Sequence, residues 1–128
     1  MASISLLIRL ARVAFFAALI FTFYSAVMPV TEAARLIPWD KALHFIAFYG
    51  LTGLALAAFP KTRLWIIAAS LSGVGALIEV VQGLPFVHRD EDFWDWVADT
   101  IAITAAMSPM LLLWWRQLAG SDQKNSDT

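Results

Sequence analysis

Ionisable side chains at helical spacing, at or inside apolar stretches, are the residues of this sequence that could do chemistry. Lys41 and His44 are three residues apart, Asp95 and Asp99 are four apart, and Glu79 stands alone in a third apolar stretch. An ionisable group in an apolar helix is costly, so each of them is a functional candidate by default. Carboxylates beside a lysine or a histidine suit acid–base chemistry or the binding of polar headgroups.

The candidate site divides into two sets of residues. If the protein is an enzyme, Glu79 and His44 are the expected acid–base groups. The ligand-binding set is expected to comprise Asp40, Lys41, Tyr49, Gln82, Arg89, Asp95 and Asp99. Asp92 continues the stripe of Asp95 and Asp99 on one helix face, but we interpret it, with Asp90 and Glu91, as a solvated loop or cap residue. A purely structural ion pair is as good an interpretation of Glu79 as a chemical role.

Composition argues against several classes of function. The chain has no cysteine, which removes disulfides and thiolate sites. Its net charge of -1 argues against a nucleic-acid partner. No glycine-rich phosphate loop and no nucleophile elbow are present, and we predict no cofactor and no metal. A zinc site from His44, His88 and a carboxylate is a weak alternative, because the histidines lack ligand spacing.

Four charge-poor segments must position these side chains. Of the 128 residues, 60% are hydrophobic and only 15% are charged, whereas soluble domains are about a quarter charged. Crossing a bilayer takes about 20 apolar residues. We therefore predict an all-α membrane protein, a four-transmembrane-helix bundle forming a single domain over 1–118. The predicted spans are about 10–30, 41–59, 64–82 and 94–115, and residues 119–128 are expected to form a disordered polar tail.

The distribution of Lys and Arg predicts an N-in/C-in orientation, because cytoplasmic segments are enriched in these residues. In this orientation the cytoplasmic cations are Arg9, Arg12, Lys61, Arg63, Arg116 and Lys124, and the outer ones are Arg35, Lys41 and Arg89. Most acidic residues and both histidines then lie outside. We therefore expect a pocket open to the outer leaflet, with Glu79 and Asp99 as its deepest charges.

The first apolar segment has an alternative interpretation as a signal peptide. Arg9 and Arg12 would form its basic region, and Thr31-Glu32-Ala33 is a weak cleavage signal. The run is long for such a peptide, so we favour a span. Cleavage would leave three helices and an outer N-terminus.

Three motifs, in this order, resemble those of the VanZ-like family of small membrane proteins. They are Asp40-Lys41-x-x-His44-Phe45-x-x-x-Tyr49, Glu79-x-x-Gln82, and Arg89 six residues before Asp95. The resemblance runs from about Asp40 to Ala106. Each motif alone is weak, but their order and spacing together are fairly specific.

The chain also departs from the family pattern. Asp99 stands where the family usually has asparagine, and Ala102 and Ala106 stand where it tends to have glycine. The resemblance implies a multi-pass protein of the bacterial cell (inner) membrane. It also implies a link to resistance to the glycopeptide teicoplanin, although many family members lie outside resistance clusters. The extra carboxylate of Asp99 puts in doubt any role that needs a neutral amide there.

Two hypotheses of function follow from these residues. In the preferred one, the outer pocket binds a lipid headgroup or a lipid-linked cell-envelope precursor, with Lys41 and Arg89 on its phosphate. In the alternative, the protein is an enzyme acting on such a lipid, with Glu79 or His44 as general base. A proton or ion pathway is less well supported, because no deep ionisable residue lies near the cytoplasmic half. Membrane lipids are the expected partners, and the sequence makes no prediction of oligomeric state.

Overall fold

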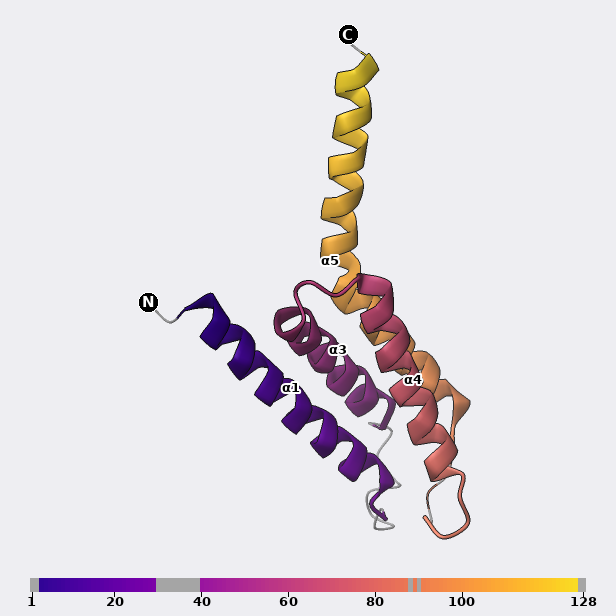
Figure 1. Cartoon of the computed structure of the whole chain (residues 1–128). Coiled ribbons are helices and arrows are strands. Elements are labelled where there is room, and N and C mark those ends of the chain that lie inside the picture. Colours follow the sequence, from indigo (N-terminus) through magenta and orange to yellow (C-terminus); the bar gives the residue numbers. More distant parts are fainter. Residues whose placement is uncertain (1–2, 30–39, 88, 90, 127–128) are drawn as a thin grey trace.

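The computed structural model describes residues 3–29, 40–87, 89 and 91–126, and within these ranges it is entirely helical (Figure 1). The helices are α1 (Ile4–Val27), α3 (Asp40–Ala58), α4 (Leu64–Gln82) and α5 (Phe93–Ser126). All four contain a stretch that is long and apolar enough to cross a membrane. The chain is thus built as a multi-pass membrane protein, and α3 and α4 cover nearly the residues that the apolar runs predict.

The first and last helices of the chain, α1 and α5, differ in length from the predicted spans. Helix α1 begins at Ile4, because the Ser3 side chain caps it by accepting a hydrogen bond from the Leu6 N–H over 3.3 Å. Helix α5 continues to Ser126, so the segment 119–126, expected to be a disordered tail, is helical. Extending an existing helix adds one hydrogen bond for each residue that is fixed, and only nucleation is costly.

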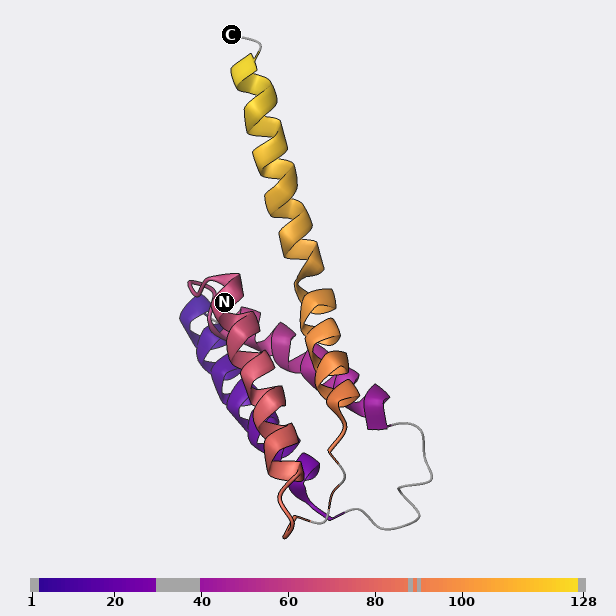
Figure 2. The ribbon, with the colours of Figure 1, turned by 90° about the vertical axis from the view of Figure 1, so that its right-hand side faces the viewer.

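The helices run alternately up and down. Figures 1 and 2 show that α1 starts at the end of the bundle where α3 joins α4, and α5 starts at the opposite end. Helix α3 is central, since it packs against α1, α4 and, most extensively, α5. Its Phe48 and Leu51 lie in the core with Ile78 of α4 and Ala102 of α5. Two distant segments, the starts of α3 and α5, are thereby brought side by side.

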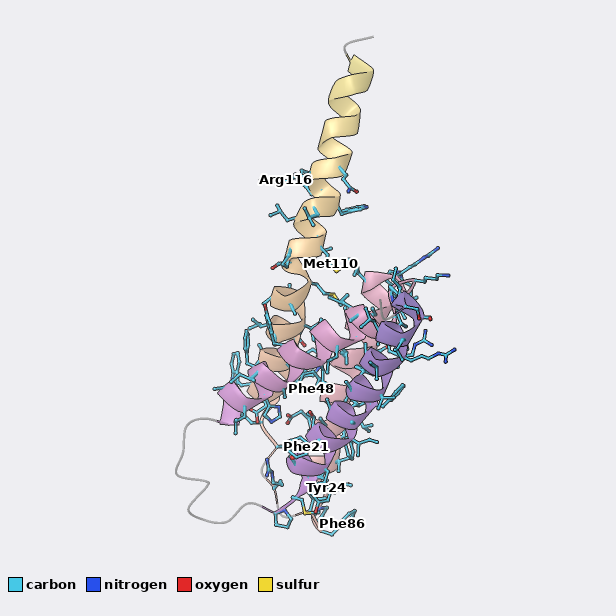
Figure 3. The ribbon with its side chains drawn as sticks, turned by 90° about the vertical axis from the view of Figure 1, so that its left-hand side faces the viewer. Phe21, Tyr24, Phe48, Phe86, Met110 and Arg116 are labelled. Carbon is cyan, nitrogen blue, oxygen red and sulfur yellow. The ribbon has the colours of Figure 1, made fainter. Side chains whose placement is uncertain are left out.

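Helix α5 changes direction near Pro109, and its second half extends beyond the other helices. Met110 and Arg116 lie on this extending part (Figure 3), where the described side chains are exposed. Proline lacks the N–H that would bond to the Ala105 carbonyl one turn earlier. The Ser108 hydroxyl donates to that carbonyl over 2.7 Å instead, which satisfies the acceptor that Pro109 leaves open.

Candidate functional site

A line of acidic and basic side chains, here called the charged ladder, joins α3 to the start of α5. It consists of Lys41 and His44 on α3 and of Asp92, Asp95 and Asp99. Lys41 Nζ hydrogen-bonds to Asp92 and lies 3.3 Å from Asp95 Oδ1. In the His44 ring, Nε2 is 3.8 Å from Asp95 Oδ2, and Nδ1 is 3.1 Å from Asp99 Oδ1. Lys41 and His44 are three residues apart, and Asp92, Asp95 and Asp99 are spaced by three and then four residues, so each set lies along one face and the two sets can pair in order.

The ladder runs from the surface into the bundle. The side chains of Lys41 and Asp92 are 53% and 39% exposed, whereas that of Asp99 is 0% exposed. His44 and Asp95 are also buried. Charged groups at this depth are stable only with partners close by. The helices α3 and α5 can therefore pack closely only when the basic side chains of α3 pair with the acidic side chains of α5.

The His44 ring lies between two carboxylates in the buried part of the ladder. Both ring nitrogens face a carboxylate, but a neutral imidazole has one N–H and one acceptor nitrogen. The Nδ1 contact with Asp99, at 3.1 Å, is a hydrogen bond, whereas the Nε2 distance to Asp95, at 3.8 Å, is longer than a hydrogen bond, so a neutral ring that carries its proton on Nδ1 fits this arrangement. His44 is thus held between Asp95 and Asp99, and each of its ring nitrogens faces a carboxylate.

Glu79 connects α4 to the ladder. Its Oε2 accepts a hydrogen bond from the Asp92 N–H over 3.0 Å, and Asp92 Oδ1 in turn accepts one from the Trp94 N–H over 3.0 Å. Both carboxylates thus satisfy free N–H groups at the start of α5, where negative charge is favoured. Glu79 also lies close enough to His44 and Asp99 for direct electrostatic interaction.

Three buried oxygen atoms in this region have no hydrogen-bond partner among the described residues. They are Glu79 Oε1, Gln82 Oε1 and Asp99 Oδ2. Each of them is a hydrogen-bond acceptor as placed. The sequence predicts an open pocket here, but Asp99 and Gln82 are fully buried, and neither of the two cavities described below is lined by ladder residues. Gln82 and Asp99 therefore lie inside the helix interface, whereas Glu79 is only partly buried.

Gln82 and Arg89, both predicted to bind a ligand, hold the end of α1 in the structure. Gln82 Nε2 donates to the Ala26 carbonyl over 2.8 Å, and Arg89 Nη1 donates to the Met28 carbonyl over 3.0 Å. The last carbonyls of a helix have no partner within the helix. These two side chains supply such partners, and the positive charge of Arg89 suits the C-terminal end of α1.

The remaining predicted residues are not brought into the ladder. Tyr49 is half-exposed and stacks against Phe45, with ring centroids 6.1 Å apart. The side chain of Asp40 and all of His88 lie outside the described residues.

Asp92, interpreted from sequence as a cap, is indeed the cap of α5, but it is also the outer acid of the ladder. Its place on the Asp95 stripe is the signal that could have identified it.

A pH dependence can be derived for Asp92, which lies outside the membrane-spanning stretches. The hydrogen bond from Lys41, and then that from the Trp94 N–H, lower the pKa of Asp92 below its ordinary value of 3.8. Because the folded-state pKa is lowered, the stability that this carboxylate contributes is present above about pH 3.8 and is lost as the pH falls through the lowered pKa.

In an NMR titration, the Asp92 carboxyl is expected to titrate below 3.8 in the wild type. The Lys41→Met variant should move this titration upward, because the first of the two stabilising hydrogen bonds is removed. Tyr49→Phe, on the same helix but outside the ladder, should leave it unchanged. An Asp92 titration that is the same with and without Lys41 would contradict the pairing.

The fold and the site define a four-helix membrane protein with a buried acid–base ladder near one end. No protein-family model matches the chain, and no curated protein or solved structure matches it. The function is therefore argued from the geometry of the ladder and its surroundings.

Proposed function

We propose that the ladder end of the bundle binds the headgroup of a membrane lipid or of a lipid-linked cell-envelope precursor. The observation that carries this proposal is the set of buried acceptors, Glu79 Oε1, Gln82 Oε1 and Asp99 Oδ2, without partners among the described residues. Leaving a buried acceptor unpaired lowers stability by about 1–3 kcal/mol. A headgroup with N–H or O–H donors would supply the missing partners.

The charges of the region favour an amine or hydroxyl in the deep position. Four carboxylates, those of Glu79, Asp92, Asp95 and Asp99, surround Lys41 and His44. A phosphate placed among them would be repelled. The half-exposed Lys41 can instead meet a phosphate at the rim, whereas Arg89 already donates to the end of α1. Glu79 is only partly buried, so the headgroup would reach it first.

The orientation and the location complete the proposal. N-in/C-in threading rests on the distribution of Lys and Arg, and the bacterial inner membrane rests on the resemblance to the VanZ-like family. Periplasmic reporter fusions should be active at Phe86 and inactive at Thr62. The reverse would place the ladder on the cytoplasmic side.

A link to teicoplanin resistance rests on the resemblance alone and would be tested by teicoplanin susceptibility with and without the protein.

Native mass spectrometry of gently released protein tests the binding. The wild type should carry a defined lipid whose headgroup contains an amine or hydroxyls. Glu79→Gln should lower its occupancy about tenfold, because a hydrogen bond to a charged group is removed. The variant keeps an oxygen that can accept from the Asp92 N–H, so the fold should persist.

Tyr49→Phe serves as the matched control, because it changes a polar side chain on α3 outside the ladder. It should retain the lipid of the wild type. The same lipids on the wild type and on both variants would contradict the proposal and would assign the ladder a structural role.

A second candidate is an enzyme acting on the same headgroup. The observation that favours it is the state of Glu79, whose Oε2 is fixed by the Asp92 N–H while Oε1 has no partner among the described residues. A general base needs one such positioned oxygen. His44 is less suited, because both ring nitrogens face carboxylates. Loss of headgroup conversion in Glu79→Gln with the lipid still bound would favour the enzyme over the binding module.

A further inference from the structure

A second polar region lies at the end of the bundle opposite to the charged ladder. A cavity of about 310 Å³ is lined there by Arg9 and Arg12 of α1 and by Phe59 and Lys61 near the turn between α3 and α4. Figures 1 and 2 show the start of α1 at the same end as this turn. The cavity therefore brings together cations from two segments that are far apart in the sequence.

These cations are not neutralised by carboxylates of the described chain. None of the ion pairs among the described residues involves Arg9, Arg12 or Lys61. Arg12 is fixed in place, because its Nε donates to the Ala58 carbonyl over 3.0 Å and its guanidinium lies 5.6 Å from the centre of the Phe59 ring. A fixed guanidinium presents its remaining N–H groups to an anion with little loss of side-chain freedom.

The basic cavity adjoins an apolar one. The second cavity, of about 250 Å³, is lined by Phe15 and Leu19 of α1, by Ile66 and other residues of α4, and by Phe59. Phe59 lines both cavities. On α1, Arg12, Phe15 and Leu19 follow the spacing of a single helix face. Leu19 lies roughly 10 Å further along the helix than Arg12, so the apolar cavity continues from the basic one toward the interior of the bilayer.

We infer that the two cavities together bind an anionic phospholipid. Its phosphate is held by Arg9, Arg12 and Lys61, and one acyl chain lies in the apolar cavity between α1 and α4. Arg and Lys match the charge and the acceptor oxygens of a phosphate, and basic pockets between transmembrane helices suit phospholipid headgroups. This site is separate from the charged ladder and would exist whatever the ladder binds.

The test uses the full chain in uncharged detergent micelles, titrated by native mass spectrometry. The probes are phosphatidylglycerol, phosphatidylcholine with the same acyl chains, and soluble glycerol 3-phosphate. We expect phosphatidylglycerol to bind most tightly. Lys61→Met should weaken this binding about fivefold, because each cation near a lipid phosphate contributes about that factor. Arg63→Met removes the same charge from the same turn but lies outside the cavity lining, so it should have little effect.

A second pair of variants tests the acyl chain. Ser70 lines the apolar cavity, and its neighbour Ala69 lines neither cavity. Ser70→Phe should fill the cavity and weaken phosphatidylglycerol binding, whereas Ala69→Phe should not. Glu79→Gln should leave this binding unchanged, which separates it from the proposed function of the ladder.

Three outcomes would overturn the inference. Equal binding of phosphatidylglycerol and phosphatidylcholine would exclude recognition of an anionic lipid. Equal losses in Lys61→Met and Arg63→Met would mean that surface charge alone attracts the lipid. Displacement of the lipid by equimolar glycerol 3-phosphate would indicate a phosphate site without a role for the acyl chain.

Discussion

Replacing His44 with leucine is expected to lower the free energy of unfolding by about 3–5 kcal/mol, the range for breaking a buried ion pair from one side. His44 Nδ1 lies 3.1 Å from Asp99 Oδ1, and the Asp99 side chain is fully buried. Without the imidazole, Asp99 would stay in the helix interface with no basic partner. The measurement is the unfolding of the purified protein in detergent micelles, followed by circular dichroism.

The double variant His44→Leu/Asp99→Leu distinguishes a lost pair from lost packing. Because it removes both partners, it should lose less stability than the sum of the two single variants. Tyr49→Leu is the control on the same helix and should cost no more than about 1 kcal/mol. Additive losses in the double variant would contradict the pairing of His44 with Asp99.

Gly75→Ala is expected to destabilise the packing of α4 against α5 by about 1–3 kcal/mol, the usual effect of overpacking. A Cβ atom at Gly75 would lie 2.8 Å from Asp99 Oδ2 and 3.4 Å from Trp96 Cδ1. Asp99 cannot move aside freely, because its other oxygen faces His44. The same unfolding measurement should detect the loss.

The neighbouring glycine provides a control of opposite sign. A Cβ at Gly73 would meet nothing within 4 Å, so Gly73→Ala should be neutral or should stabilise the helix by up to about 1 kcal/mol. In an Asp99→Ala background, Gly75→Ala should be less harmful, because the nearest atom has been removed. Equal effects of Gly73→Ala and Gly75→Ala would contradict the close approach of α4 to Asp99.

The helices could be predicted from the sequence because length and charge are properties of single segments. The apolar runs at 41–59 and 64–82 are bounded by prolines and charges, and α3 and α4 cover nearly these residues. The start of α1 was less predictable, because it depends on the cap that Ser3 forms. The end of α5 was missed because polar composition was interpreted as disorder, although a helix that has already formed can continue through it.

The sequence could point to Lys41, His44, Asp95 and Asp99 as candidate residues, but it could not predict their pairings. Lys41 and His44 were candidates on one apolar segment, and Asp95 and Asp99 were candidates on another. The structure places these two sets against each other. The positions of Gln82 and Arg89 could not be foreseen in the same way. Their partners are the carbonyls of Ala26 and Met28. Every residue has a backbone carbonyl, so residue types do not indicate which carbonyl a side chain will bind.

The pairing of α3 with α5 also constrains the order in which the protein can be assembled. The partners of Lys41 and His44 stand 51 and 55 residues later in the chain. During synthesis, α3 is therefore complete before Asp92 and Asp99 exist, and α4 is made in between. Because a lone lysine or histidine is unfavourable in hydrocarbon, we expect α3 to settle at its final depth after the start of α5 has emerged. A chain truncated after α4 would contain three apolar helices and still lack the segment on which the second of them depends.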